Sequence, residues 1–277
     1  MRIQKSRRLL NKVMGDRADY SMRDFLEKTI KAAGELTLEY RSHLETVRVN
    51  HKSAKDLVTE ADVAVEKFIC EKIKEAYPSH AILGEETGKT AGDDNLWIID
   101  PIDGTTSFVY HQPFYSVSIA LQQGREITLG AVYAPVLGEL FIASKGGGAF
   151  LNGKRISVSD CQKPEDSLLA TGFACLRSDH EDNNLPVFNK LMPIIRGVRR
   201  FGSAAVDMCY VGCGRLDGFW EFNLNIYDIA AGKIVLEEAG GRCSDFSGGQ
   251  EKLCSEVLAT NGKLHKQISD MIMSVRD

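Results

Sequence analysis

Apolar residues recur at three- and four-residue steps in two stretches of the N-terminal part of the chain, and this spacing predicts amphipathic helices. The first stretch begins near Ser21, whose hydroxyl can cap a helix, with Asp24 three residues further on. Its expected buried face carries Phe25, Thr29, Ala32, Leu36 and Tyr40. The second stretch runs from about Thr59 to Tyr77, and Pro78 ends it. Its expected buried face carries Val65, Phe68, Ile69, Ile73 and Ala76.

Short apolar runs bounded by glycine, proline and polar residues predict β-strands in the middle of the chain. These runs lie at 81–83, 96–99, 115–121, 128–134 and 139–144. Asn152-Gly153 predicts a tight turn. After a polar connector, strands and helices are expected in alternation at 168–172, 203–213, 218–222 and 227–239. The pattern predicts a mixed α and β protein with two sheet-and-helix halves.

The length of 277 residues is enough for one large core or for two small domains that share an interface. We expect a basic N-terminal arm at 1–20, an N-terminal α+β half at 21–163 and a C-terminal α/β half at 164–277. The arm contains Arg2, Lys5, Arg7, Arg8, Lys12 and Arg17. It is either a solvated extension or a contact for RNA or an acidic partner, and the sequence leaves both open.

Composition narrows the class of protein. A net charge of −4 argues against a nucleic-acid-binding protein, because the chain as a whole lacks a basic footprint. No apolar run approaches the roughly 18 residues that span a bilayer, and no signal peptide is expected. The seven cysteines are scattered and form no C-x-x-C pair, which favours reduced thiols in a cytoplasmic protein over a zinc site.

The strongest chemical signal is the segment W-I-I-D-P-I-D-G-T-T at 97–106. A hydrophobic strand ends in Asp100, Pro101 is expected to stop further strand pairing, and Asp103 follows. Two carboxylates on a rigid turn can share a hard cation, which prefers oxygen ligands. Free N–H groups at Gly104 and Thr105 can hold a phosphate oxygen. The segment therefore predicts a metal site beside an anion site.

Further carboxylates are placed to join this site. Glu85 and Glu86 follow the strand at 81–83, where α/β sheets carry ligand groups. Asp228 lies at the expected start of the helix at 227–239. Structural roles remain as alternatives, since Asp228 can cap its helix and a carboxylate at 100 or 103 can stabilise a turn.

These motifs resemble those of the inositol monophosphatase family. D-P-I-D-G-T-T is similar to the first family signature, and Y-D-I-A-A-G-K-I-V-L-E-E-A-G-G at 227–241 is similar to the second. Tyr227 stands where the family usually has tryptophan, next to a ligand position and not at one. The family's D-x-V-T-x-x-D stands at 56–62 and its G-E-E at 84–86. The match covers about residues 22–265 and implies a layered αβαβα sandwich, magnesium dependence and often a homodimer.

The resemblance implies two or three Mg²⁺ ions in each site. It assigns Glu85, Asp100 and the backbone carbonyl of Ile102 to the first ion. It assigns Asp100, Asp103 and Asp228 to the second ion. A third, weaker ion would lie near Glu85 and Asp62. The attacking water would be held by Glu85 and Thr105, with Asp62 orienting Thr105. No covalent enzyme intermediate is required.

The substrate contacts implied by the family match lie in two places. Gly104 and Thr105 would present N–H groups to the phosphate. Ser203 and Ala204, in G-S-A-A-V-D-M, match the stretch that touches a sugar-like ring in the family. Glu221, seven residues before Asp228, would accept hydrogen bonds from ring hydroxyls, unless it is only an exposed charge at a strand end.

The expected activity is Mg²⁺-dependent hydrolysis of a phosphate monoester of a small polyol, with myo-inositol 1-phosphate as the first choice. Similar signatures occur in enzymes acting on fructose 1,6-bisphosphate, histidinol phosphate or adenosine 3′,5′-bisphosphate. The stretch 103–120 is more similar to the inositol type than to the nucleotide type. Two alternatives stay open: a dual inositol monophosphatase and fructose-1,6-bisphosphatase, and an enzyme with an added non-catalytic role at the transcription machinery, which the basic arm could serve.

Overall fold

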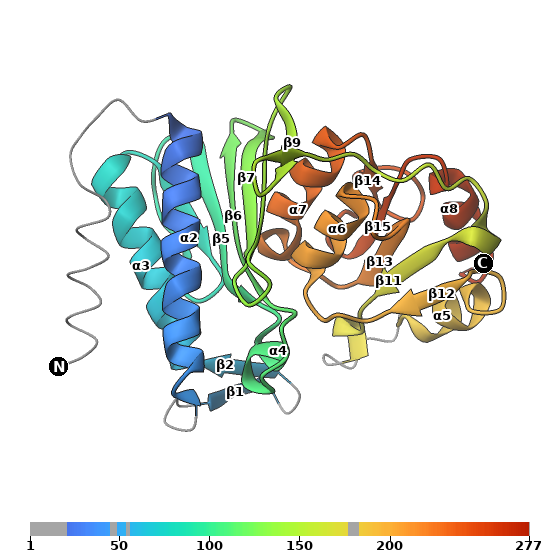
Figure 1. Ribbon diagram of the computed structural model, residues 1–277, viewed down its shortest axis with the longest axis horizontal. Helices are drawn as coiled ribbons and strands as arrows, with labels where there is room; N and C mark the ends of the chain where they lie inside the picture. The colour runs from blue at the N-terminus through green and yellow to red at the C-terminus, as the bar shows by residue number, and fades with distance from the viewer. Residues whose placement is uncertain (1–20, 45–48, 54–55, 177–182, 277) are drawn as a thin grey trace.

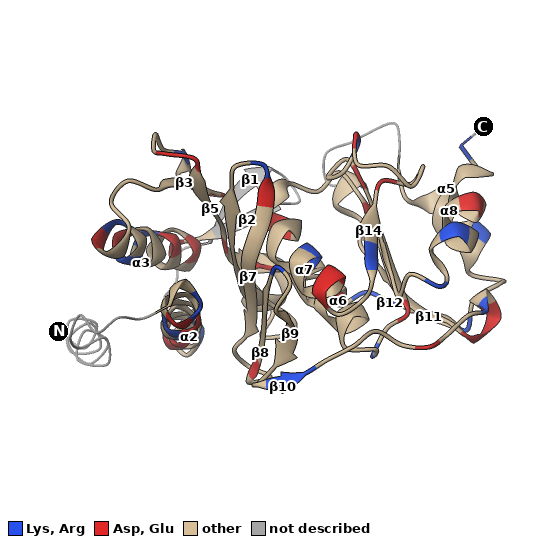
Figure 2. Ribbon diagram, turned by 90° about the horizontal axis from the view of Figure 1, so that it is seen from above, with Lys and Arg blue, Asp and Glu red and all other residues tan. Residues whose placement is uncertain are grey.

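The computed structural model describes residues 21–44, 49–53, 56–176 and 183–276. They are arranged as five layers in the order helix, sheet, helix, sheet, helix (Figures 1 and 2). The predicted αβαβα sandwich is therefore confirmed. The basic arm predicted at 1–20 lies outside the described residues. In the described part of the chain, no helix combines the length and the apolar character that crossing a membrane requires.

The first layer consists of α2 (Met22–Arg41) and α3 (Glu60–Ala76), as the periodicity predicts. Ser21 caps α2 and accepts a hydrogen bond from the Asp24 backbone N–H at 3.2 Å. The buried face of α3 follows the prediction at Val65, Ile69 and Ile73. The predicted face of α2 is confirmed only in part, since Thr29 and Ala32 are buried as expected. The fully buried side chains of this helix include Leu26, Ile30 and Ala33, because these point at the sheet, while Phe25, Leu36 and Tyr40 are only partly covered.

The second layer is an eight-stranded sheet in the order β10-β9-β8-β7-β6-β5-β3-β4. Its strands are β3 (Ala81–Gly84), β4 (Gly88–Lys89), β5 (Asn95–Asp103), β6 (Ser116–Gln123), β7 (Glu126–Ala134), β8 (Glu139–Ser144), β9 (Gly148–Leu151) and β10 (Lys154–Arg155). β3 and β5 are parallel, with Gly84 opposite Ile99, so the next residues, Glu85 and Asp100, lie at the same edge of the sheet. A two-stranded sheet of β1 (Val49–Ser53) and β2 (Asp56–Thr59) and the short helix α4 (Thr105–Val109) lie beside that edge (Figure 1).

The prediction that Pro101 stops strand pairing is wrong in one respect. β5 pairs with β6 at Asp100, shifts register, and pairs again at Asp103 opposite Ser116. Proline has no N–H to donate and is tolerated at such an irregularity of a sheet. The interruption turns the chain between the two aspartates without ending the strand.

The third layer is α6 (Ala204–Gly212) and α7 (Ile226–Glu238), which lie between the two sheets (Figures 1 and 2). Every residue of α6 is buried, because sheets or helices cover it on all sides. The largest cluster of buried apolar residues surrounds these two helices and joins the sheets. The start of each helix is therefore held in a fixed place relative to β5.

The fourth layer is a five-stranded sheet in the order β12-β11-β13-β15-β14, covered by α5 (Leu185–Leu191) and α8 (His265–Met273). Its strands are β11 (Leu168–Thr171), β12 (Gly197–Arg199), β13 (Gly218–Phe222), β14 (Arg242–Ser244) and β15 (Glu256–Thr260). The predicted strands at 168–172 and 218–222 are confirmed as β11 and β13. They are parallel to each other, and β13 carries Glu221.

Candidate active site

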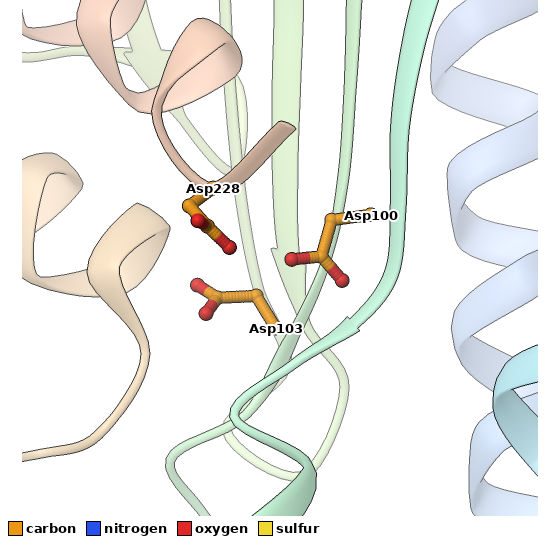
Figure 3. A group of neighbouring side chains, drawn as sticks. All are labelled: Asp100, Asp103 and Asp228. Atoms are coloured by element: carbon orange, nitrogen blue, oxygen red, sulfur yellow. The ribbon is translucent and has the colours of Figure 1, made fainter. Parts of the chain in front are cut away.

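Three aspartates meet between the eight-stranded sheet and the central helices. Carboxylate oxygens of Asp100, Asp103 and Asp228, one from each residue, all lie within 4.8 Å of one another. Figure 3 shows the three side chains turned toward a common centre, two of them from β5 and one from the start of α7. Asp100 and Asp103 are buried and Asp228 is partly covered. This all-oxygen set suits a hard divalent cation such as Mg²⁺.

Asp103 is fixed by the N-terminus of α6. Its Oδ2 accepts hydrogen bonds from the Ser203 hydroxyl at 2.6 Å and from the Ala205 N–H at 2.8 Å. The Ala204 N–H lies 3.3 Å from its other oxygen. A carboxylate is stabilised there because the first N–H groups of a helix have no partner within it. The second half of the chain thus orients a carboxylate that belongs to the first half.

Asp228 is placed differently from the sequence-based expectation. The helix begins at Ile226 and is capped by Asn225, so Asp228 is its third residue and does not open it. Its Oδ2 accepts the Asn225 N–H at 2.5 Å, which is the reciprocal half of a capping box. Its carboxylate is turned toward the other two aspartates (Figure 3). The residue therefore combines a helix-terminal hydrogen bond with membership of the cluster.

The three carboxyl groups disfavour each other's ionised state. The pKa of Asp100 is raised well above its usual range by burial, and then by Glu85, Asp103 and Asp228. Burial raises the pKa of Asp103 to about 6 against the effect of its hydrogen bonds, and the pKa of Asp228 is raised by burial and by Asp103. A bound cation reverses this balance, because it favours the ionised form of each ligand. The cluster is therefore a candidate site for a cation.

Asp62 and Thr105 form a second polar group beside the cluster. Asp62 is buried in the first turn of α3, where its Oδ2 accepts hydrogen bonds from the Thr59 N–H at 2.8 Å and hydroxyl at 2.6 Å. Its other oxygen lies 3.3 Å from the Thr105 hydroxyl, which is also 3.2 Å from the Ile102 carbonyl. Burial raises the pKa of Asp62 to about 6, with Thr59 offsetting part of the effect. The start of α3 thereby orients the hydroxyl of Thr105.

Glu85 lies in the turn after β3, and a buried acid supports that turn. Glu66 of α3 is fully buried and accepts the N–H groups of Glu86 at 2.9 Å and Thr87 at 2.8 Å. A Cβ at Gly84 would lie 2.3 Å from the Glu66 carboxylate, so a larger residue there would displace that carboxylate. Glu66 was not predicted as a functional residue, although a glutamate beside the buried face of an amphipathic helix is a detectable signal in the sequence.

A cavity of about 350 Å³ opens above the cluster. The predicted residues that line it are Glu85, Asp100, Ile102, Asp103, Gly104, Thr105, Ala204, Glu221 and Asp228. Ser203 does not line it: its side chain is buried behind the wall, where it caps α6 and donates to Asp103. Glu221 is also buried, and its carboxylate accepts the Ala174 N–H at 3.0 Å. Asp207 and Arg200 line the cavity as well, and neither was predicted as a site residue.

Known proteins resemble the chain over most of its length. The model of the inositol monophosphatase family matches residues 19–276. A "Nus factor SuhB" from Pseudomonas aeruginosa is 43% identical over 248 residues, which are 87% of this chain and 92% of that protein. An inositol-1-monophosphatase from Synechocystis is 47% identical over 222 residues, which are 79% of this chain and 77% of that protein.

Solved structures agree with this assignment. The structure of an inositol monophosphatase from Anabaena is 38% identical and superimposes with a TM-score of 0.82. The alignment covers 91% of this chain and 95% of that one. The five layers, the carboxylate cluster and the match over nearly the whole length lead to one conclusion. The chain belongs to the inositol monophosphatase family.

Proposed function

We propose that the chain hydrolyses the phosphate monoester of a small polyol, with myo-inositol 1-phosphate as its substrate and Mg²⁺ as its metal. The observation that carries the proposal is the all-oxygen cluster of Asp100, Asp103 and Asp228 in the floor of a cavity. The family assignment supports a phosphatase, and the names of two relatives support the inositol ester.

The residues proposed to hold the metal are those of the cluster, together with Glu85 and the Ile102 carbonyl. A third ion would lie near Glu85 and Asp62. Hydrolysis of a phosphate monoester needs a barrier reduction on the order of 20 kcal/mol. When bound, Mg²⁺ would supply much of it by activating water and by neutralising charge on the attacking and leaving oxygens.

The remaining groups would position the water and the phosphate. The Thr105 hydroxyl, held by Asp62 and by the Ile102 carbonyl, is proposed to orient the attacking water together with Glu85. The N–H groups of Gly104 and Thr105 are proposed to bind a phosphate oxygen. Gly104 has a φ of 95°, and a Cβ there would lie 2.9 Å from the Gly202 carbonyl, so this backbone approach needs glycine.

Glu221 is proposed to read the hydroxyl groups of the polyol. Replacing Glu221 with alanine should lower kcat/KM for myo-inositol 1-phosphate by tenfold or more, because the ring hydroxyls lose their acceptor. The loss on p-nitrophenyl phosphate should be much smaller, since that ester has no hydroxyls to read. Steady-state kinetics on both esters, with fructose 1,6-bisphosphate as a third, measures the selectivity. Fructose 1,6-bisphosphate as the better substrate would favour the dual-activity alternative.

The matched control is Glu256→Ala. Glu256 is as buried as Glu221, lies on the neighbouring strand β15, and pairs with Arg276 away from the cavity. Its loss should leave the ratio of the two activities unchanged. Equal losses on both esters in Glu221→Ala would assign Glu221 to the structure of the wall.

One observation favours a second, additional role. The Pseudomonas relative is called a Nus factor, which favours a non-catalytic contact with the transcription machinery beside the enzymatic activity. Such a contact would leave the carboxylate set untouched.

A further inference from the structure

One carboxyl group in the cavity wall has an oxygen without a partner. Asp207 of α6 is 2% exposed and lines the cavity, yet its Oδ1 makes no hydrogen bond within the described part of the chain. Buried polar side-chain atoms nearly always have a hydrogen-bond partner. Leaving one without a partner costs stability. Because Asp207 lines the cavity, a ligand bound there is a candidate for the missing partner.

Neither of the obvious structural roles accounts for Asp207. A carboxylate that serves the fold accepts several hydrogen bonds, as Asp217 does from the Ser159 hydroxyl at 2.6 Å and the Leu168 N–H at 2.7 Å. A metal ligand would belong to the cluster, but the group of mutually close carboxylates found in the described residues consists of Asp100, Asp103 and Asp228. Asp207 lines the same cavity without being part of that group.

The surroundings of Asp207 fit a polyol. Helix α6 packs against β13, which carries Glu221, and both carboxyl groups line the cavity. Burial raises the pKa of Asp207 well above its usual range, and Glu221 and Asp103 raise it further, against the effect of Arg200. A carboxyl group that keeps its proton can both donate and accept a hydrogen bond, as a hydroxyl does.

We propose that Asp207 is a substrate-contacting residue, whose Oδ1 forms a hydrogen bond with a hydroxyl of the polyol, beside the hydroxyl that Glu221 reads. The site would then select esters that present two hydroxyls at a spacing that reaches both carboxyl groups. This inference rests on the proposed function and extends it from a general polyol to one read by a pair of carboxyl groups.

The test compares Asp207→Leu, which keeps the approximate size but cannot form hydrogen bonds, with Asp207→Asn, which can. The leucine variant should lower the ratio of kcat/KM for myo-inositol 1-phosphate to that for p-nitrophenyl phosphate by about tenfold, mainly through KM. The asparagine variant should keep that ratio within about threefold. The melting temperature of the leucine variant should equal or exceed that of the wild type, because a buried oxygen without a partner has been removed.

Monodeoxy analogues of myo-inositol 1-phosphate identify the hydroxyl. With the wild type, one of these analogues should have a kcat/KM about tenfold below that of the full substrate. With Asp207→Leu, the same analogue and the full substrate should have equal kcat/KM, because the hydrogen bond is already missing on the side of the enzyme. The matched control is Asp217→Asn, which should lower the melting temperature and leave the ratio of activities unchanged.

Two results would overturn the inference: an unchanged ratio of activities in Asp207→Leu, or a melting temperature that falls as it does in Asp217→Asn. Its failure is distinguishable from failure of the proposed function. If the proposed function fails, the wild type with Mg²⁺ releases phosphate from none of the three esters. If only the inference fails, the wild type hydrolyses myo-inositol 1-phosphate, and the Asp207 variants do not show the predicted ratios.

Discussion

Replacing Asp228 with asparagine is expected to lower the turnover of myo-inositol 1-phosphate roughly hundredfold or more, as for lost transition-state electrostatics. The substitution keeps the size of the side chain and removes one of the three charges that converge in the cluster. Asp228 comes from α7, whereas Asp100 and Asp103 come from β5, so it closes the proposed second metal site across the junction of two layers. Binding of the first Mg²⁺ should persist, and calorimetric titration beside steady-state kinetics measures both effects.

The capping-box hydrogen bond of Asp228 predicts a different outcome. An asparagine can still accept the Asn225 N–H, so a purely helix-terminal role would leave both turnover and stability nearly unchanged. Asp24→Asn is the matched control. Asp24 is also the third residue of its helix, and its carboxylate accepts a hydrogen bond from the capping residue Ser21. It is far from the residues of the cluster in sequence. Normal turnover and two normal Mg²⁺ affinities in Asp228→Asn would remove Asp228 from the site.

Mg²⁺ is expected to raise the melting temperature, and to raise it more at pH 7.5 than at pH 5. In the metal-free protein the pKa values of Asp62 and Asp103 are raised from 3.8 to about 6, and burial raises that of Asp100 well above its usual range. An acid with a raised folded-state pKa contributes stability below its unfolded pKa and loses that contribution as the pH rises through the folded value. The stability of the metal-free protein should therefore fall as the pH rises from about 4 to about 7.

A cation offsets this loss by binding the ionised carboxylates. Mg²⁺ at a hundredfold excess over its Kd adds about 2.7 kcal/mol to the free energy of unfolding. In a chain of this length that corresponds to roughly 5–10 °C in Tm. At pH 5 protons compete for the same oxygens, so the shift should be smaller. Thermal melting with EDTA and with millimolar Mg²⁺ at both pH values, at matched ionic strength, gives the comparison; equal shifts at the two pH values would contradict it.

The pattern of apolar residues predicted the two long N-terminal helices and several short strands, and it missed other elements of the C-terminal half. The helices at 22–41 and 60–76 follow from their apolar steps and terminal signals. β14 has three residues, too few for a period-two pattern to stand out, and α8 lies where no helix was predicted. The order of the five layers came from the family signatures, because the contacts that set it join residues far apart in sequence.

The candidate site shows the same division. The residues of the site that belong to local motifs, such as Asp100 and Asp103, were identifiable from the sequence. The orientation of Asp103 by Ser203 was not, since the two lie 100 residues apart. Asp207 could not be recognised either: a buried oxygen without a partner is a property of the packed cavity and leaves no trace in a pattern of residue types.

Phosphate release from myo-inositol 1-phosphate by the purified chain, with Mg²⁺ and with EDTA, tests the central claim most directly. We predict steady release with millimolar Mg²⁺, loss of nearly all of it in EDTA, and recovery when Mg²⁺ is returned in excess. Hydrolysis at the same rate in EDTA would contradict the assignment of the carboxylate cluster as a catalytic metal site.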